Sequence, residues 1–246
     1  MRADQLLVQR GLAASRSQAQ RLIKAGLRWR LQNGEWQAAH KNGADIPSQA
    51  ELQLASDAET RYVSRGGLKL EGALRATGLD VRGRRCLDVG QSTGGFTHCL
   101  LQRGAAHVTG VDVGHGQLHP SLANDARVRC IEGVNARYLN ADIPGGAAFD
   151  VIVGDVSFIS LTLILPALVS LLADGGHILM LVKPQFELQP HEIGKGGVVR
   201  AAALYDKVRQ KIESACTAQG WRIVHWLPSP ICGGDGNREF FIHAQK

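Results

Sequence analysis

Four charged side chains stand at or near the ends of predicted strands, where they could act on one substrate: Lys69, Asp155, Lys183 and Glu239. Asp155 and Lys183 come just after the apolar runs 151–153 and 178–182, and Glu239 begins the last apolar run. Ligands of open α/β sheets bind at the carboxyl ends of the strands. Such a side chain alone is usually just solvated, but lysines and carboxylates that converge can hold a hydroxyl group and move its proton. Together these four residues are therefore stronger candidates for a functional site than any one of them alone.

A glycine-rich turn between a strand and a helix predicts a nucleoside site. The strand 86–89 runs into Gly-Gln-Ser-Thr-Gly-Gly-Phe-Thr at 90–97, followed by a predicted helix at 98–102. Asp112 lies 22 residues after Gly90, at the end of the next strand, where nucleotide-binding folds hold a ribose diol. Ser92 replaces the second glycine of the dinucleotide fingerprint, so the pyrophosphate turn is not reproduced. S-adenosylmethionine has no phosphate and needs no such turn, and Ser92 or Thr93 can form hydrogen bonds with its carboxylate and amine.

Apolar runs that alternate with helical stretches predict a doubly wound α/β domain. Strands are expected at 86–89, 108–113, 128–131, 151–153 and 178–182, and further helices at 159–172 and 201–218. The late strands 222–227 and 240–243 are joined by a loop too short for a crossover helix. We therefore expect these two strands to pair in antiparallel fashion.

The first 30 residues carry the whole net charge of +6, because the rest of the chain is neutral. Asp4 can cap a first helix that Gly11 ends, and Ser15 with Gln18 forms a capping box for a second helix. Asn33-Gly34 then predicts a hairpin with a two-residue turn. A basic surface attracts polyanions, but basic runs are also common on solvated helix faces. Charge alone leaves both interpretations open.

Composition argues against a membrane-spanning or secreted protein. The longest apolar stretch, 159–173, contains polar residues and Pro166 and is shorter than the roughly 20 residues that cross a bilayer. No apolar signal segment follows Met1, so the expected compartment is the cytoplasm. Five cysteines without a Cys-x-x-Cys spacing suit reduced thiols, and no metal site is expected.

Six longer motifs extend over nearly the whole chain: YVSRGGLKL at 62–70, DVGQSTGGFT at 88–97, GDVSFISL at 154–161, VKPQFE at 182–187, GKGGVVR at 194–200 and GGDGNREFF at 233–241. Together they resemble the TlyA family, whose members are often labelled hemolysins and resemble S4-fused, FtsJ-like ribose 2′-O-methyltransferases. Before them, Arg16-x-x-Ala19-x-x-Leu22-Ile23-x-x-Gly26 with the Asn-Gly hairpin resembles the S4 RNA-binding module. Gln91 and His98 depart from the family, which commonly has a small and an acidic residue there.

The resemblance implies an α/β chain with an S4-like α+β domain at 1–58, a linker at 59–64 and a Rossmann-like methyltransferase domain at 65–246. It implies transfer of a methyl group from S-adenosylmethionine to a cytidine 2′-hydroxyl of large-subunit (23S) rRNA, and in some members also of small-subunit (16S) rRNA. The partner is then ribosomal RNA or a ribosomal subunit. The implied cofactor-binding residues are Asp88, Gly90, Ser92, Thr93, Gly94, Gly95, Phe96, Thr97, Asp112 and Asp155. The implied RNA-binding residues are Arg2, Arg10, Arg16, Arg21, Lys24, Arg28, Arg30 and Arg65.

The family's Lys-Asp-Lys-Glu tetrad carries over to Lys69, Asp155, Lys183 and Glu239. A ribose 2′-hydroxyl is a poor nucleophile until its proton is removed, and Lys183 is our candidate base, with Asp155 and Glu239 orienting it and holding the ribose. Methylation of a base fits less well. Methylation of an exocyclic amine commonly uses an Asn/Asp-Pro-Pro-aromatic run, where this chain has Asp155-Val-Ser-Phe158. Methylation of pyrimidine C5 needs a cysteine nucleophile, often after a proline, and no cysteine here directly follows a proline.

Three other functions fit the sequence less well. An RNA-binding ribosome-assembly factor without catalysis is opposed by the presence of all four tetrad residues. Membrane lysis is opposed by the lack of a wide amphipathic helix with a basic face. An oxidoreductase is disfavoured by Ser92 and by the pair of lysines.

Overall fold

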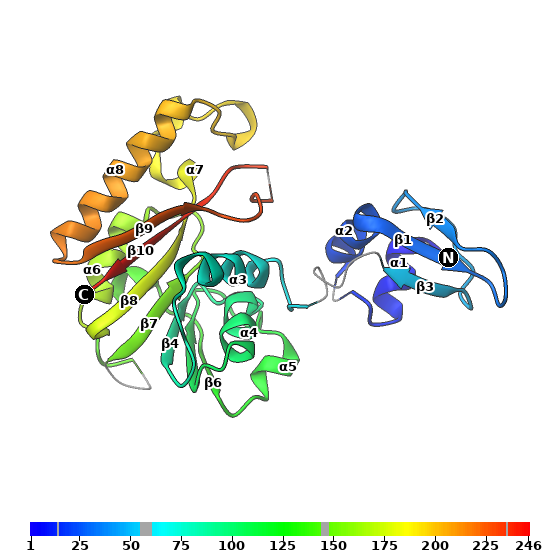
Figure 1. Ribbon diagram of the computed structural model, residues 1–246, viewed down its shortest axis with the longest axis horizontal. Helices are drawn as coiled ribbons and strands as arrows, with labels where there is room; N and C mark the ends of the chain where they lie inside the picture. The colour runs from blue at the N-terminus through cyan, green and yellow to red at the C-terminus, as the bar shows by residue number, and fades with distance from the viewer. Residues whose placement is uncertain (14, 55–60, 144–147, 235) are drawn as a thin grey trace. The chain divides into compact units, whose positions relative to one another are not determined.

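The computed structural model describes residues 1–13, 15–54, 61–143, 148–234 and 236–246 (Figure 1). These residues form two compact units, Met1–Arg65 and Gly66–Lys246. The predicted domain end at 58 and the first two residues of the predicted linker 59–64 lie outside the described residues. The unit boundary falls just after Arg65.

The smaller unit packs two helices on a three-stranded antiparallel sheet of order β2-β1-β3. Its elements are α1 (Ala3–Gln9), α2 (Arg16–Gly26), β1 (Leu27–Arg30), β2 (Gln37–Ala39) and β3 (Glu51–Leu54). The Ser15 side chain accepts a hydrogen bond from Gln18 N and caps α2, as its sequence predicts. Buried Ala19, Leu22 and Ile23 share one face of α2, so this face joins the core of the unit.

Two details of this unit differ from the sequence prediction. Asp4 does not cap α1, because Arg2 occupies the cap position and the buried Asp4 carboxylate accepts hydrogen bonds from Arg2 and Arg16. The hairpin connection is longer than two residues, because the last pair of β1 and β2 is Trp29 with Gln37. Asn33 still adopts a left-handed φ of 59° within that connection.

The larger unit is a doubly wound sheet of seven strands in the order β6-β5-β4-β7-β8-β10-β9 (Figure 1). The strands are β4 (Arg85–Val89), β5 (His107–Val111), β6 (Val128–Ile131), β7 (Phe149–Gly154), β8 (Leu172–Val182), β9 (Arg222–Pro228) and β10 (Phe240–Gln245). The first five in spatial order are parallel, whereas β10 pairs in antiparallel fashion with both β8 and β9. The expected antiparallel C-terminal pair is confirmed.

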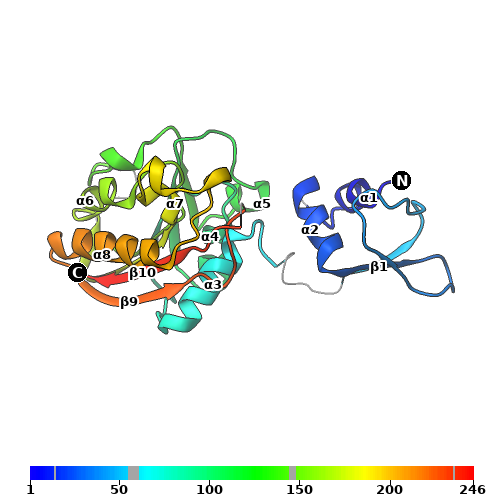
Figure 2. The same ribbon diagram turned by 90° about the horizontal axis from the view of Figure 1, so that it is seen from above.

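Helices cover both faces of this sheet. They are α3 (Gly66–Thr77), α4 (Gly95–Gln102), α5 (Pro120–Ala123), α6 (Leu165–Leu168), α7 (Pro184–Glu187) and α8 (Ala202–Ala218). On one face, Ile212 of α8 and Leu168 of α6 share a core with Ile242 of β10. On the other face, Phe96 of α4 stacks on Phe241 of β10 at 6.2 Å between ring centroids. Figure 2 shows α8 running alongside β9 and β10.

The predicted helix 159–172 is wrong, because this segment forms only a 3-10 turn, η3 (Leu161–Leu163), and the short α6 before β8 begins at Leu172. Pro166 lies in the first turn of α6, where its missing N–H costs no helical hydrogen bond. A helix that continued through Pro166 from residue 159 would lose such a bond and clash with the preceding turn. None of the described helices has the length and apolar composition of a membrane crossing.

Three histidines form a row across the strands β8, β10 and β9. His243 lies between His177 and His225, with ring nitrogens 3.0 Å and 3.1 Å from theirs, and is only 3% exposed. Burial, together with the two neighbouring histidines, lowers the pKa of His243 to about 4. This value lies below the ordinary 6.5, so between these two values the unfolded chain binds a proton that the folded protein does not. The free energy of unfolding is therefore unaffected by His243 above pH 6.5 and falls as the pH falls from 6.5 towards 4.

We expect His243→Phe to flatten the pH dependence of stability in that window. Phenylalanine keeps an aromatic ring in the packed position but has no group to protonate. Urea unfolding at pH 7 and pH 4 should show that the wild type loses about 3 kcal/mol more than the variant. Burial raises the pKa of Asp88 to about 7, but that contribution is common to both proteins and cancels in the difference. Parallel stability curves would remove His243 as the titrating group.

Candidate active site

Lysine and carboxylate side chains alternate in one connected chain at the carboxyl edge of the larger sheet. Lys69 Nζ lies 2.5 Å from Glu239 Oε2 and 4.0 Å from Asp155 Oδ2. Asp155 Oδ1 in turn lies 2.7 Å from Lys183 Nζ. Lys183 Nζ also donates a hydrogen bond to Ser157 Oγ at 2.6 Å. The structure therefore brings together all four residues of the predicted tetrad.

Neighbouring strand ends position these side chains. Asp155 directly follows β7, and Lys183 directly follows β8, the strand that pairs with β7. Glu239 directly precedes β10, whose Phe240 pairs with Val182 at the end of β8. Because β10 is antiparallel to β8, its beginning meets the end of β8 at the same edge.

Lys69 reaches the same point from helix α3, which the sequence analysis did not predict. Its side chain is 9% exposed, and that of Glu239 is 3% exposed. Glu239 is therefore nearly covered and acts on Lys69 rather than on a ligand. The Asp155 side chain is 22% exposed, so its carboxylate is more accessible to a ligand than that of Glu239.

A cavity of about 550 Å³ lies directly beside this chain of charges. Of the predicted cofactor-binding residues, the structure brings four into its wall: Gly90, Ser92, Asp112 and Asp155. Ser157 also lines it, so the cavity and the lysine-carboxylate chain share Asp155 and Ser157. Its volume falls in the range of sites for small molecules and cofactors.

Asp112 organises the loop on the cavity floor. Its Oδ2 accepts a hydrogen bond from Ser92 N at 2.8 Å, and its Oδ1 accepts one from Gly114 N at 2.7 Å. Ser92 adopts a left-handed φ of 47° in this loop. A carboxylate offers about four acceptor positions, so Asp112 retains capacity for two hydroxyl donors such as a ribose diol.

Gly90 is required by a close approach of two backbones. Its φ is +81°, and a Cβ atom there would lie 2.8 Å from the carbonyl oxygen of Asp155. Any side chain at this position would push the end of β4 away from the turn that carries Asp155.

Six predicted cofactor-binding residues do not line the cavity: Asp88, Thr93, Gly94, Gly95, Phe96 and Thr97. Phe96 packs on Phe241 in the interior. Thr97 donates hydrogen bonds to Asp88 Oδ2 from its backbone N at 2.9 Å and from its hydroxyl at 2.7 Å. The buried Asp88, Phe96 and Thr97 fix the start of α4 against β4, so their effect on the cavity is through the position of the loop, whereas Thr93 is exposed.

Sequence reasoning missed several residues of the cavity wall. Val113, Gln117, Asn135 and Phe158 line it, and Phe158 has a left-handed φ of 64°. Ser157, which binds Lys183, was visible only as part of the motif at 154–161. A signal existed for Asn135 and Gln117, because both follow predicted strands of the sheet, but polar residues in loops are too common to be singled out.

The basic residues of the smaller unit divide into tethered and exposed groups. Arg2 and Arg16 bind Asp4 and lower its pKa below the usual range, with the hydrogen bond from Arg2 as the largest cause. Arg10 donates to the carbonyl oxygens of Ser48 and Ala50. These contacts leave less of each guanidinium free for RNA.

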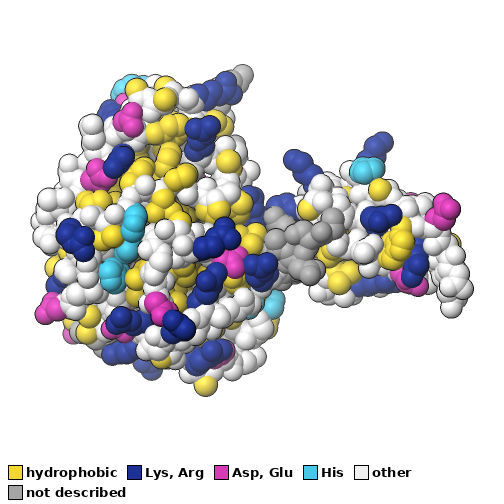
Figure 3. All heavy atoms as spheres, in the orientation of Figure 1, with side chains coloured by type: hydrophobic (Ala, Val, Ile, Leu, Met, Phe, Trp, Pro, Cys, Tyr) yellow, Lys and Arg dark blue, Asp and Glu magenta, His cyan; other side chains and the backbone are white. Residues whose placement is uncertain are grey.

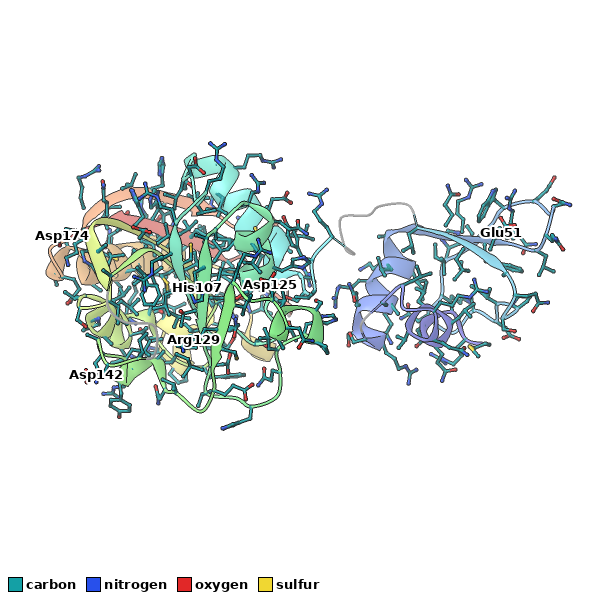
Figure 4. The ribbon with its side chains drawn as sticks, turned by 90° about the horizontal axis from the view of Figure 1, so that it is seen from below. Glu51, His107, Asp125, Arg129, Asp142 and Asp174 are labelled. Atoms are coloured by element: carbon teal, nitrogen blue, oxygen red, sulfur yellow. The ribbon has the colours of Figure 1, made fainter. Side chains whose placement is uncertain are left out.

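Arg30 on β1 forms an ion pair with Glu51 on β3; Glu51 is labelled in Figure 4. The Arg30 Cζ atom also lies 4.7 Å from the ring centre of Trp36. Lys24 and Arg28 are exposed, Arg21 is half-buried on α2, and Arg65 ends the unit. On the face seen in Figure 3, lysine and arginine side chains lie over both units. Among the described residues, no group of three or more His, Cys, Asp or Glu side chains is arranged to hold a metal ion.

Comparison with known proteins identifies two matching family models. The model of FtsJ-like methyltransferases matches residues 62–246, and that of the S4 domain matches residues 1–27. The 16S/23S rRNA (cytidine-2′-O)-methyltransferase TlyA of Mycobacterium tuberculosis is 47% identical over 98% of this chain and 88% of its own length. Hemolysin A of Brachyspira hyodysenteriae is 39% identical over 99% of both chains. A solved structure from Streptococcus thermophilus, 43% identical, covers 100% of this chain and 88% of its own, with a TM-score of 0.78.

Proposed function

We propose, from the premise that this chain belongs to the family of FtsJ-like methyltransferases, that it methylates the 2′-hydroxyl of a cytidine in ribosomal RNA. The observation that carries the proposal is the junction of cavity and charges at Asp155 and Ser157. A cofactor in the cavity and a hydroxyl at Lys183 would meet there. The M. tuberculosis relative, a 16S/23S rRNA (cytidine-2′-O)-methyltransferase, supports this substrate class, and we propose 23S rRNA as the principal target.

The cavity fits S-adenosylmethionine. Its wall offers Asp112 for the ribose diol, and Ser92 with Gln117 as polar partners for the amino-acid end. Apolar contact for an adenine ring comes from Val113, Val134 and Ile159. Bound there, S-adenosylmethionine supplies an electrophilic methyl group.

The chain's own task is to place a ribose and take up a proton. We assign to Lys183 Nζ the acceptance of the 2′-hydroxyl proton, which requires its neutral form at that moment. Asp155 and Ser157 fix the position of this nitrogen through contacts of 2.7 Å and 2.6 Å. Lys69 holds Asp155 from the other side, and Glu239 pairs with Lys69, so the two lysines and two carboxylates of the cluster balance in charge.

The smaller unit supplies affinity for RNA in this proposal. Its exposed Lys24 and Arg28 are suited to phosphate contacts, and such contacts add sequence-independent, salt-dependent affinity. Arg21 and Arg65, together with the tethered arginines, remain predicted RNA-binding residues. Because its proposed substrate is ribosomal RNA, we also propose that the enzyme acts in the cytoplasm.

The test is transfer of labelled methyl from S-adenosylmethionine to purified large and small ribosomal subunits and to naked 23S and 16S rRNA. The modified position is mapped by its resistance to alkaline cleavage, because a methylated 2′-oxygen cannot attack the adjacent phosphate. We expect one resistant cytidine in 23S rRNA. A resistant cytidine in 16S rRNA alone would move the target to the small subunit. Binding of the cofactor without transfer to any RNA would favour an assembly factor over an enzyme.

A further inference from the structure

A buried carboxylate outside the tetrad connects the two segments that carry Asp155 and Lys183. The Glu187 side chain, at the end of α7, is 1% exposed. Its Oε2 accepts hydrogen bonds from Ser160 Oγ at 2.5 Å and from Lys211 Nζ at 2.9 Å. Its Oε1 accepts one from Leu161 N at 2.7 Å. Both carboxylate oxygens therefore accept hydrogen bonds, three in all.

These contacts join three segments of the fold. Ser160 and Leu161 belong to the turn after β7, which also carries Asp155 and Ser157. Glu187 belongs to the single helical turn α7, which Lys183 caps. Lys211 Nζ, from α8, also donates to the backbone oxygen of Glu187 at 2.8 Å, so it closes the end of α7. A helix of one turn has little stability of its own and needs such external contacts.

The turn after β7 needs an anchor because its backbone is strained. Phe158 has a φ of 64°, and a left-handed bulky residue costs about 1–3 kcal/mol that surrounding contacts must offset. Ser157, the hydrogen-bond partner of Lys183, immediately precedes it. Bonds from Ser160 and Leu161 to Glu187 fix the turn just beyond the strained residue.

We infer that Glu187 is a positioning residue for methyl transfer, acting through Lys183 and Ser157. Lys183, in the segment after β8, contacts Asp155 and Ser157 in the turn after β7. Glu187, four residues after Lys183, binds Leu161 in the same turn and so connects the same two segments a second time. A buried ion pair contributes little net stability compared with apolar packing, so its value here lies in geometry. This inference rests on the proposed function for its kinetic effect but not for its structural one.

The test compares Glu187→Ala and Glu187→Gln with Glu192→Gln. Glu192 is the matched control, since it also links the segment after β8 to α8, through Lys207 at 2.6 Å, but its contacts among the described residues are with Lys207 and Gln189 rather than with the turn after β7. In Glu187→Ala, kcat should fall about 10²-fold while KM for S-adenosylmethionine and rRNA stays within about twofold, because misplacement of reacting groups acts on the chemical step. Glu187→Gln keeps the side-chain volume and an acceptor for Leu161 N, so it should recover most of kcat. Glu192→Gln should match the wild type.

A second measurement does not depend on methyl transfer. The rate at which Lys183 reacts with acetic anhydride, read by mass spectrometry against exposed Lys24, should rise several-fold in Glu187→Ala and stay unchanged in Glu192→Gln. Unchanged kcat and unchanged Lys183 reactivity in both Glu187 variants would overturn the inference. So would an equal loss in the control, or a rise in KM alone. If the wild type transfers no methyl group, the proposed function fails, and the Lys183 reactivity alone decides the role of Glu187.

Discussion

Replacing Lys183 by alanine is expected to lower kcat for methyl transfer by about 10³-fold or more, the upper part of the range for general acid-base groups. The dissociation constant for S-adenosylmethionine should change little, because Lys183 is not among the residues that line the cavity. Asp155 keeps Lys69 as a partner in the variant, so the site is not left with an unpaired carboxylate. Single-turnover rates and an equilibrium titration with the cofactor measure the two quantities separately.

Lys183→Arg distinguishes a base from a fixed positive charge. Arginine keeps a cation next to Asp155 but does not lose its proton in proteins, so it cannot accept one from a hydroxyl group. We expect this variant to be as inactive as Lys183→Ala. Lys207→Ala, which removes an exposed lysine paired with Glu192, is the control and should retain full activity. Substantial turnover by the arginine variant would mean that Lys183 supplies charge rather than proton transfer.

Removing residues 1–58 is expected to raise KM for rRNA by about 10²-fold at physiological salt, with cofactor binding unchanged. The segment 1–30 holds the whole net charge of the chain, and lost phosphate contacts weaken binding to polyanions steeply. The cavity and the tetrad lie wholly within Gly66–Lys246, which forms a compact unit by itself. RNA binding measured over a series of salt concentrations should show a shallower slope for the truncated protein.

A double variant, Lys24→Gln with Arg28→Gln, tests the same role without removing the unit. Both side chains are exposed, so the fold should tolerate the change. Each lost phosphate contact should reduce the salt slope by about 0.7 to 0.9. The RNA-binding role of the smaller unit is wrong if the protein without residues 1–58 binds rRNA as tightly as the intact chain.

The positions of the strands were accessible from sequence because apolar runs and their polar flanks are local signals. The run 128–131 matches β6, and the helix expected at 201–218 matches α8 to within one residue. The tetrad was accessible because its members stand beside strand ends and within recognisable motifs. Their convergence follows from sheet topology, which places the ends of β7 and β8 and the start of β10 together.

What the sequence did not reveal depends on contacts between distant residues. Glu187, Ser160 and Lys211 form one network although each stands in a different segment, and no local pattern links them. Thr97 similarly turned out to serve Asp88 in the interior, because a glycine-rich motif does not show which of its side chains point inward.

The placement of β10 between β8 and β9 determines when during synthesis the enzyme becomes active. Glu239 and β10 are synthesised after the other six strands of this sheet, yet β10 lies between β8 and β9 and Glu239 is the ion-pair partner of Lys69. No nascent fragment that stops before Glu239 carries the full tetrad, even when the nucleoside cavity formed by β4, β5 and β7 is already encoded. We therefore expect catalysis to begin only after Glu239 and β10 have been synthesised and have joined the sheet.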